Sequence, residues 1–217
     1  MTVVRIAVEA GKKKTFAVAL DWPGWARAAA GEEAAVAALA DYAERFRPVA
    51  AAAGLAFPAE ADLTYRIVRR WPGSGNTDFG VPAAVGDEDR AAVDAELAER
   101  HVALLTAAWG LFDAQAEVSP EELRKGPRGG GRDRDVMVGH VLSSEAVYAR
   151  KIGIKHPEPQ PGDTAAIESL RAAVLEVLGK PSGEVAPGAK GWPPRYAARR
   201  FVWHVLDHLW EMQDRSQ

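Results

Sequence analysis

Two histidines near the end of the chain have the residue type and spacing of metal ligands. His204 and His208 are four residues apart in the segment RRFVWHVLDHLWEMQD, residues 199–214, and the whole chain has five histidines. If this segment is a helix, that spacing places both imidazoles on one face, one turn apart. The other residues of this face are apolar, namely Phe201, Val205 and Met212. The pattern therefore predicts that both rings point inward.

A third histidine, His140, holds the same kind of position in VMVGHVLSSEAVYARKIG, residues 136–153. Facing helices of a bundle can bring such side chains onto one ion. Three neutral imidazoles with an open position are typical of a catalytic metal site, and imidazole suits zinc, nickel, iron and copper. We expect a divalent metal, zinc, nickel or iron, on His140, His204 and His208. Ser144 and Tyr148 are candidate catalytic residues, because their hydroxyls could donate hydrogen bonds to a bound ligand. They lie on the same stripe as His140, together with Met137, Val141 and Val147.

Each histidine also has a simpler interpretation than that of a metal ligand. A single inward histidine is more often a packed core residue than a ligand, and an HxxxH pair also occurs by chance. His101, four residues after Leu97, is a rival ligand or a supporting group, although a packed or surface role is preferred. His156 is expected in a loop. Glu211 could orient the imidazole of His208 or could be a solvated charge at a helix end.

Arginines could frame an anionic substrate, or could simply be solvated: Arg128, Arg132, Arg134, Arg195, Arg199 and Arg200. The segment GPRGGGR lacks the Lys-Ser/Thr ending of a phosphate loop, which argues against nucleotide binding there.

Composition narrows the chemistry further. The 217 residues carry a formal net charge of −3 and no cysteine. A disulfide framework, a thiolate zinc site and a cysteine nucleophile are therefore excluded, and any thiol chemistry must use a thiol from a small molecule. The N-terminus lacks the pattern of a signal peptide, and no apolar run approaches the roughly 20 residues of a membrane span. We expect a cytoplasmic protein with a small-molecule substrate and neither a membrane nor a nucleic acid partner.

The elements that must position these residues fall into two halves of an α+β fold. In residues 1–84 strand patterns alternate with a helical one. Strands are expected at 3–10, 14–22 and 62–71, and a helix is expected at 31–46. Gly54 is expected to stop a helix. Residues 71–88 are rich in Gly, Pro, Asn and Asp and form the expected domain boundary.

Helical patterns dominate residues 85–217. Asp87 is expected to begin a helix that runs to about residue 115, and Ser119–Leu123 (SPEEL) matches a capping box that begins another. Further helices are expected from Asp133 or Asp135 to about residue 152, from Asp163 to 178, and from Pro194 to about residue 214. Four substantial amphipathic helices predict a four-helix bundle.

The order of these motifs resembles the DinB superfamily of bacterial four-helix-bundle proteins, over about residues 87–217. The resemblance rests on SPEEL, the Gly-rich loop, GHVLSSEAVYARKIG and the closing HxxxH helix. It implies a metal on His140, His204 and His208, and a transferase or isomerase that uses a thiol such as bacillithiol or mycothiol. The Ala-, Arg- and Gly-rich composition favours mycothiol. Hydrolysis by a metal-bound hydroxide is equally compatible with the absence of cysteine.

The segment FAVALDWPGWARAAAGEEAAVAALADYA resembles HicB-like domains, small α/β antitoxin folds, over about 50 residues. A structural or lid role is favoured over nucleic acid binding, because no basic face is concentrated there. Lys12–Lys14, with Trp22 and Trp25 taken as exposed, could bind a partner instead.

Three hypotheses remain open. The chain is a metal-dependent transferase or hydrolase, or a non-catalytic binding protein that uses its N-terminal domain for recognition and its bundle for dimerisation, or a stress-response protein whose histidines are relics. A homodimer is compatible with an all-α bundle that has spare apolar surface.

Overall fold

The structure is a computed structural model that describes residues 1–126 and 130–216, and its mixed composition confirms the α+β class. The strands are β1 (Thr2–Ala10), β2 (Thr15–Ala19), β3 (Ala26–Ala29) and β4 (Leu63–Pro72). The helices of the first half are α1 (Glu32–Asp41), α2 (Ala43–Ala52), the 3-10 turn η1 (Glu60–Asp62), α3 (Gly75–Phe79) and α4 (Asp87–Arg90). The long helices are α5 (Ala95–Val118), α6 (Arg134–Lys151), α7 (Thr164–Leu178) and α8 (Pro194–Arg215).

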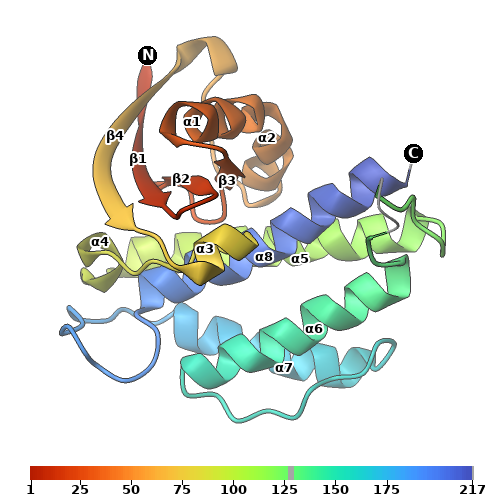
Figure 1. Cartoon of the computed structure of the whole chain (residues 1–217). Helices are drawn as coiled ribbons and strands as arrows, with labels where there is room; N and C mark the ends of the chain where they lie inside the picture. Colours follow the sequence, from red (N-terminus) through yellow and green to blue (C-terminus); the bar gives the residue numbers. More distant parts are fainter. Residues whose placement is uncertain (127–129, 217) are drawn as a thin grey trace.

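Four strands form one sheet in the order β3-β2-β1-β4. β1 is antiparallel to β2 and parallel to β4, with Ile6 opposite Ala19 on one side and Ile67 on the other. All residues of β2 are buried, as are Val4, Ile6, Ala7 and Val8 of β1. In Figure 1 this sheet and α1 and α2 lie on one side of the crossing pair α5 and α8, and α6 and α7 lie on the other.

An aromatic cluster fills the core of the sheet unit, and it corrects the expectation that Trp22 and Trp25 are exposed. Both side chains are buried, at 8% and 0% exposure. Trp25 stacks on Phe46 at a centroid distance of 5.6 Å, and its Nε1 donates a hydrogen bond of 2.9 Å to the carbonyl of Leu39. Burying the indole ring while its N–H finds a partner is the lower-energy arrangement.

Two helices expected to be continuous are broken. Residues 31–46 form α1 and the start of α2, separated at Tyr42, whose ring packs edge-on against Trp210 of α8. The helix expected from Asp87 stops at Arg90, because Val93 pairs with Ser182 in a short β-bridge. Asp94 then begins α5, and its carboxylate accepts a hydrogen bond of 2.8 Å from the amide of Leu97.

The helix expected at SPEEL does not form. Ser119 instead ends α5, where its hydroxyl donates to the carbonyl of Gln115 at 2.8 Å. Within residues 120–126 Leu123 is the one buried residue, and the sequence reaches Gly126 and Pro127 within a turn or two. A segment this short and this poor in apolar residues cannot repay the cost of helix nucleation.

The sheet unit and the long helices share one apolar core, in which Trp25 and Phe46 belong to the same cluster as Leu105 and Phe201. Gly24 approaches α8 closely, since its φ is 93° and a Cβ there would lie 2.3 Å from the side chain of Val202. The turn DWPG therefore fixes the sheet unit against the middle of α8.

Within the described ranges, the search for an apolar helix of membrane-crossing length finds none.

Candidate metal centre

Helices α6 and α8 carry the three histidines, and both begin and end close to where the sequence predicts. α6 begins after Asp133, whose carboxylate accepts a hydrogen bond of 3.1 Å from the amide of Leu123. α8 begins with Pro194 at its first turn and runs unbroken to Arg215. Pro is favoured there because its missing N–H would have no intrahelical partner. One face of α8 is almost completely buried, which turns His204 and His208 inward as expected.

The three imidazoles meet at one point between the two helices. Nε2 of His140 lies 3.3 Å from Nε2 of His204. One nitrogen from each of the three rings lies within 4.8 Å of the other two. Two nitrogens on a tetrahedral zinc ion are about 3.4 Å apart, since each bond is about 2.0–2.1 Å long. The nitrogens of His140 and His204 therefore already have the spacing that a shared ion requires. A small movement of the His208 ring toward them would complete the set of three.

Burial keeps the rings of His140 and His204 in the form that binds metal. Desolvation, with the neighbouring His208 and Arg132, lowers the pKa of His140 to about 4. Deeper burial, again with the other two histidines nearby, lowers the pKa of His204 well below its ordinary value. At neutral pH both side chains are uncharged and offer a nitrogen lone pair.

Glu211 holds His208 in one orientation. Its Oε2 lies 3.0 Å from Nδ1 of His208, and its Oε1 lies 3.1 Å from Nη2 of Arg215. The hydrogen bond to His208 is the main cause that lowers the pKa of Glu211, so the carboxylate is ionised and can only accept. Nδ1 of His208 must then be the donor, which leaves its Nε2 lone pair free for a cation. This carboxylate–imidazole arrangement is the usual support of a metal-bound histidine.

The two candidate catalytic residues lie beyond His140 on α6. The Tyr148 ring is 5.5 Å from that of His204, and its hydroxyl accepts a hydrogen bond of 2.9 Å from Nη2 of Arg200. Burial raises the pKa of Tyr148, so the phenol keeps its proton and can donate it to another acceptor. Ser144 is half-buried, and among the described residues its hydroxyl has no hydrogen-bond partner.

Arg200 lies near the histidines and contacts Tyr148. Its side chain is 4% exposed and lies over the rings of Tyr148, Trp192 and Trp203. It precedes His204 by one helical turn, so the i, i+4 spacing places it on the same stripe. Arg200 therefore brings positive charge and Tyr148 brings a hydroxyl to the same side of the histidines.

The other arginines do not gather into one substrate frame. Arg132 lies close enough to contribute to the lowered pKa of His140. Arg134 pairs with Asp135, Arg195 donates to the carbonyl of Ala92, and Arg199 forms a buried pair with Asp89. Arg128 lies outside the residues that the structure describes.

The remaining two histidines are away from the cluster. His101 is buried on α5, which is the packed one of the two expected roles, packed or surface, and it does not belong to the group of three. His156 lies in the loop after α6 and bonds the carbonyl of Pro157 and the hydroxyl of Ser169.

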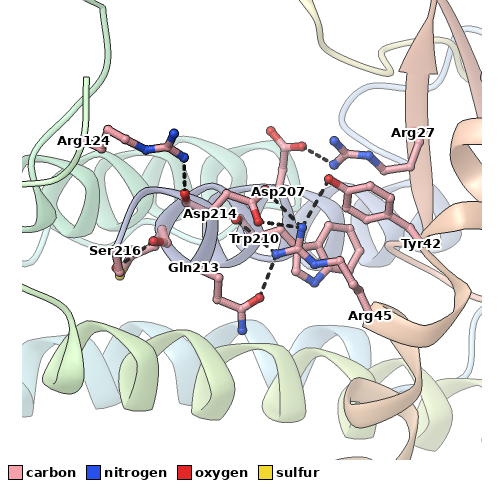
Figure 2. Close-up of polar contacts among 10 residues, drawn as sticks. Arg27, Tyr42, Arg45, Arg124, Asp207, Trp210, Gln213, Asp214 and Ser216 are labelled. Carbon is pink, nitrogen blue, oxygen red and sulfur yellow. Dashed lines mark hydrogen bonds and ion pairs between the residues drawn. The ribbon is translucent and has the colours of Figure 1, made fainter. Parts of the chain in front are cut away.

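The sheet unit anchors the part of α8 that carries the ligands, a contact that no sequence signal predicted. Arg27 of β3 pairs with Asp207 at 3.0 Å, directly beside His208. Arg45 of α2 reaches the carbonyl of Trp210 and the side chains of Gln213 and Asp214. Figure 2 shows these contacts converging on one face of α8. The partners are more than 160 residues apart in sequence, so local spacing could not reveal them.

Comparison of the chain with family models, with curated proteins and with solved structures finds no match in any of the three.

Proposed function

We propose that the chain is a metal-dependent enzyme of the DinB type, a thiol-dependent transferase or a metal-hydroxide hydrolase acting on a small molecule. The observation that carries the proposal is the convergence of His140, His204 and His208 from two helices, with nitrogens within 4.8 Å of one another. Its runner-up, a non-catalytic binding protein, loses support because Trp22 and Trp25 are buried and unavailable to a partner.

The donor set fits a divalent cation of the zinc, nickel or iron kind. Imidazole nitrogens suit these ions, and three protein ligands leave a position for a small molecule. A cation held there would supply Lewis-acid chemistry, by lowering the pKa of a thiol or a water molecule that it binds.

The surrounding residues would orient and stabilise what binds. Glu211 fixes the ring of His208, and the shared core of α6 and α8 keeps the three nitrogens close together. Tyr148 has a proton to donate, because its oxygen already accepts from Arg200. That arrangement suits a ligand with an acceptor oxygen next to the reacting atom. Ser144, on the same stripe one turn nearer to His140, would offer a second hydroxyl.

A cobalt-substituted protein distinguishes the two chemistries. If a low-molecular-weight thiol such as mycothiol is the cosubstrate, its addition should produce a thiolate-to-cobalt charge-transfer band, whereas its serine-containing analogue should not. If the protein is a hydrolase, the thiol should leave the cobalt spectrum unchanged while the metal-loaded protein hydrolyses activated esters. Neither response in metal-loaded protein would contradict the proposed function.

Two variants control that experiment. His140→Gln removes one half-buried ligand and should abolish the cobalt spectrum, with circular dichroism as the check on folding. His156→Gln changes a histidine of the loop, bonded to Pro157 and Ser169, and should leave the spectrum unchanged.

A further inference from the structure

We propose that the chain has a second binding site, for a small organic anion with a carboxylate or phosphate group, between the sheet unit and helices α5 and α8. The site is a cavity of about 510 Å³. Its walls come from β1, the turn after β2, α4, α5 and α8, so a ligand there would touch both halves of the chain. A cavity of this size is in the range that small-molecule sites occupy.

The walls carry positive charge that the protein does not neutralise. Three acidic residues line the cavity, and each is already engaged by a guanidinium: Asp21 by Arg5, Asp89 by Arg199, and Glu88 by Arg69. Two further arginines of the lining, Arg100 and Arg195, have no carboxylate partner within residues 1–126 and 130–216.

Arg100 and Arg195 are held in place by neutral groups. Arg100 donates a hydrogen bond of 3.1 Å to the carbonyl of Asp21, and its guanidinium carbon lies 4.1 Å from the centre of the Trp22 ring. Nε of Arg195 donates to the carbonyl of Ala92 at 3.1 Å. Each guanidinium has five N–H donors, so both retain donors for an oxyanion.

His101 supplies the second, independent sign of a ligand. It lines the same cavity and is 2% exposed, yet its Nδ1 has no hydrogen-bond partner among the described residues. Both Arg100 and Arg195 are close enough to act electrostatically on this ring. A buried polar atom without a partner is costly, so this ring keeps a hydrogen-bonding capacity that the described residues leave unused.

The acidic side of the cavity indicates a further feature of the ligand. Oε2 of Glu88 is buried without a hydrogen-bond partner, although Oε1 pairs with Arg69. This oxygen is closed to solvent, so a ligand with a hydroxyl group as well as its anionic group would satisfy it after a small movement of the Glu88 side chain. The chemistry expected is therefore that of a hydroxy acid or a phosphorylated alcohol.

This site is separate from the metal centre. Arg195 precedes His204 by nine residues of α8. At about 100° and 1.5 Å per residue, the two side chains lie on opposite faces of the helix and about 13 Å apart along its axis. The inference consequently does not depend on the proposed function.

Isothermal titration of the full chain with inorganic phosphate and, separately, with L-malate tests the proposal. We expect saturable binding of at least one probe by the wild type, and binding at least tenfold weaker in the double variant R100M/R195M. The matched control R66M/R150M removes two exposed arginines outside this cavity and should bind as the wild type does. The preferred probe distinguishes a phosphate from a carboxylate ligand.

Two further measurements keep the result clear. Leu97→Trp should fill the cavity without altering its charge, and should weaken binding even if R100M/R195M does not fold. The His101 ring signals in NMR spectra should shift with the bound probe, and His140→Gln should not change binding. No saturable binding of either probe, or equal binding by wild type and Leu97→Trp, would overturn the proposal, as would loss of binding in His140→Gln.

Discussion

Oε2 of Glu211 lies 3.0 Å from Nδ1 of His208, one helical turn away on α8, and this contact fixes which nitrogen of that imidazole faces His140 and His204. The carboxylate also lies 3.1 Å from Arg215, so it is held from two sides. A ligand that is already oriented loses less entropy when a cation binds.

The first prediction concerns Glu211→Gln. Loss of the negative charge weakens the hydrogen bond from His208 and lowers the basicity of its ring, so metal affinity should fall by about 10–100-fold. Competition with a chromogenic chelator measures the affinity. Glu117→Gln, an exposed carboxylate near the end of α5, is the control and should bind metal normally. Unchanged affinity in Glu211→Gln would show that this contact does not support a ligand.

The second prediction concerns pH and the buried Glu145 of α6. Burial raises its pKa to about 7, although Arg171 and the Nε1–H of Trp109, which donates at 2.6 Å, oppose the shift. The folded-state pKa is thus above the unfolded value. Between about pH 4.5 and pH 7 the unfolded chain releases this proton while the folded chain retains it, so the contribution to stability is lost as pH rises.

Denaturant unfolding at about pH 5 and about pH 8 measures this effect. Relative to Glu145→Gln, the wild type should lose on the order of 1–3 kcal/mol of unfolding free energy between the two pH values. The difference between the two proteins isolates Glu145 from all other titrating groups. Identical pH slopes would mean that Glu145 is ionised throughout this range.

The third prediction concerns the buried ion pair that joins α8 to α4. Nε of Arg199 lies 2.7 Å from Asp89, and both side chains are under 10% exposed. Arg199→Met would leave Asp89 buried without a counter-charge and should lower the free energy of unfolding by about 3–5 kcal/mol. The double variant D89N/R199M should recover part of that loss.

Arg70→Met provides the matched control, because its pair with Glu32 lies on the surface. Its cost should be at most about 1 kcal/mol. Equal costs for Arg199→Met and Arg70→Met, measured by denaturant unfolding, would contradict the burial of the Arg199 pair.

The fourth prediction concerns the shared core. Trp25 is fully buried against Phe46 and Phe57, so Trp25→Ala should cost about 3–5 kcal/mol. Because the core is continuous with the long helices, the unfolding midpoint should move equally for two probes: far-ultraviolet circular dichroism, which reports mainly the long helices, and hydrogen exchange of the β1 and β2 amides, which reports the sheet unit. Phe79→Ala, at a side chain that is 84% exposed, should change neither probe. A shift confined to one probe would show that the two halves unfold separately.

Periodicity predicted the convergence of His140, His204 and His208 because their positions depend on helix faces alone. The long apolar stripe of α8 leaves one orientation for His204 and His208, and the burial of Met137 and Val141 turns His140 toward them. The bounds of α7 and α8 followed from Asp163 and Pro194, which are local signals.

Features that depend on tertiary contacts could not be predicted in this way. Val93 leaves the helical path to pair with Ser182, and Ser119 ends a helix instead of beginning one. The burial of Trp22 and Trp25, and the ion pair between Arg27 and Asp207, depend on how the sheet unit packs on the helices. Residue spacing along one element holds no information about a partner so far along the chain.

Anomalous scattering from a crystal of the metal-loaded protein, recorded on both sides of the absorption edge of the bound metal, tests the central claim most directly. We expect one strong peak within bonding distance of His140, His204 and His208 at once. A peak elsewhere, or none in fully loaded protein, would contradict it.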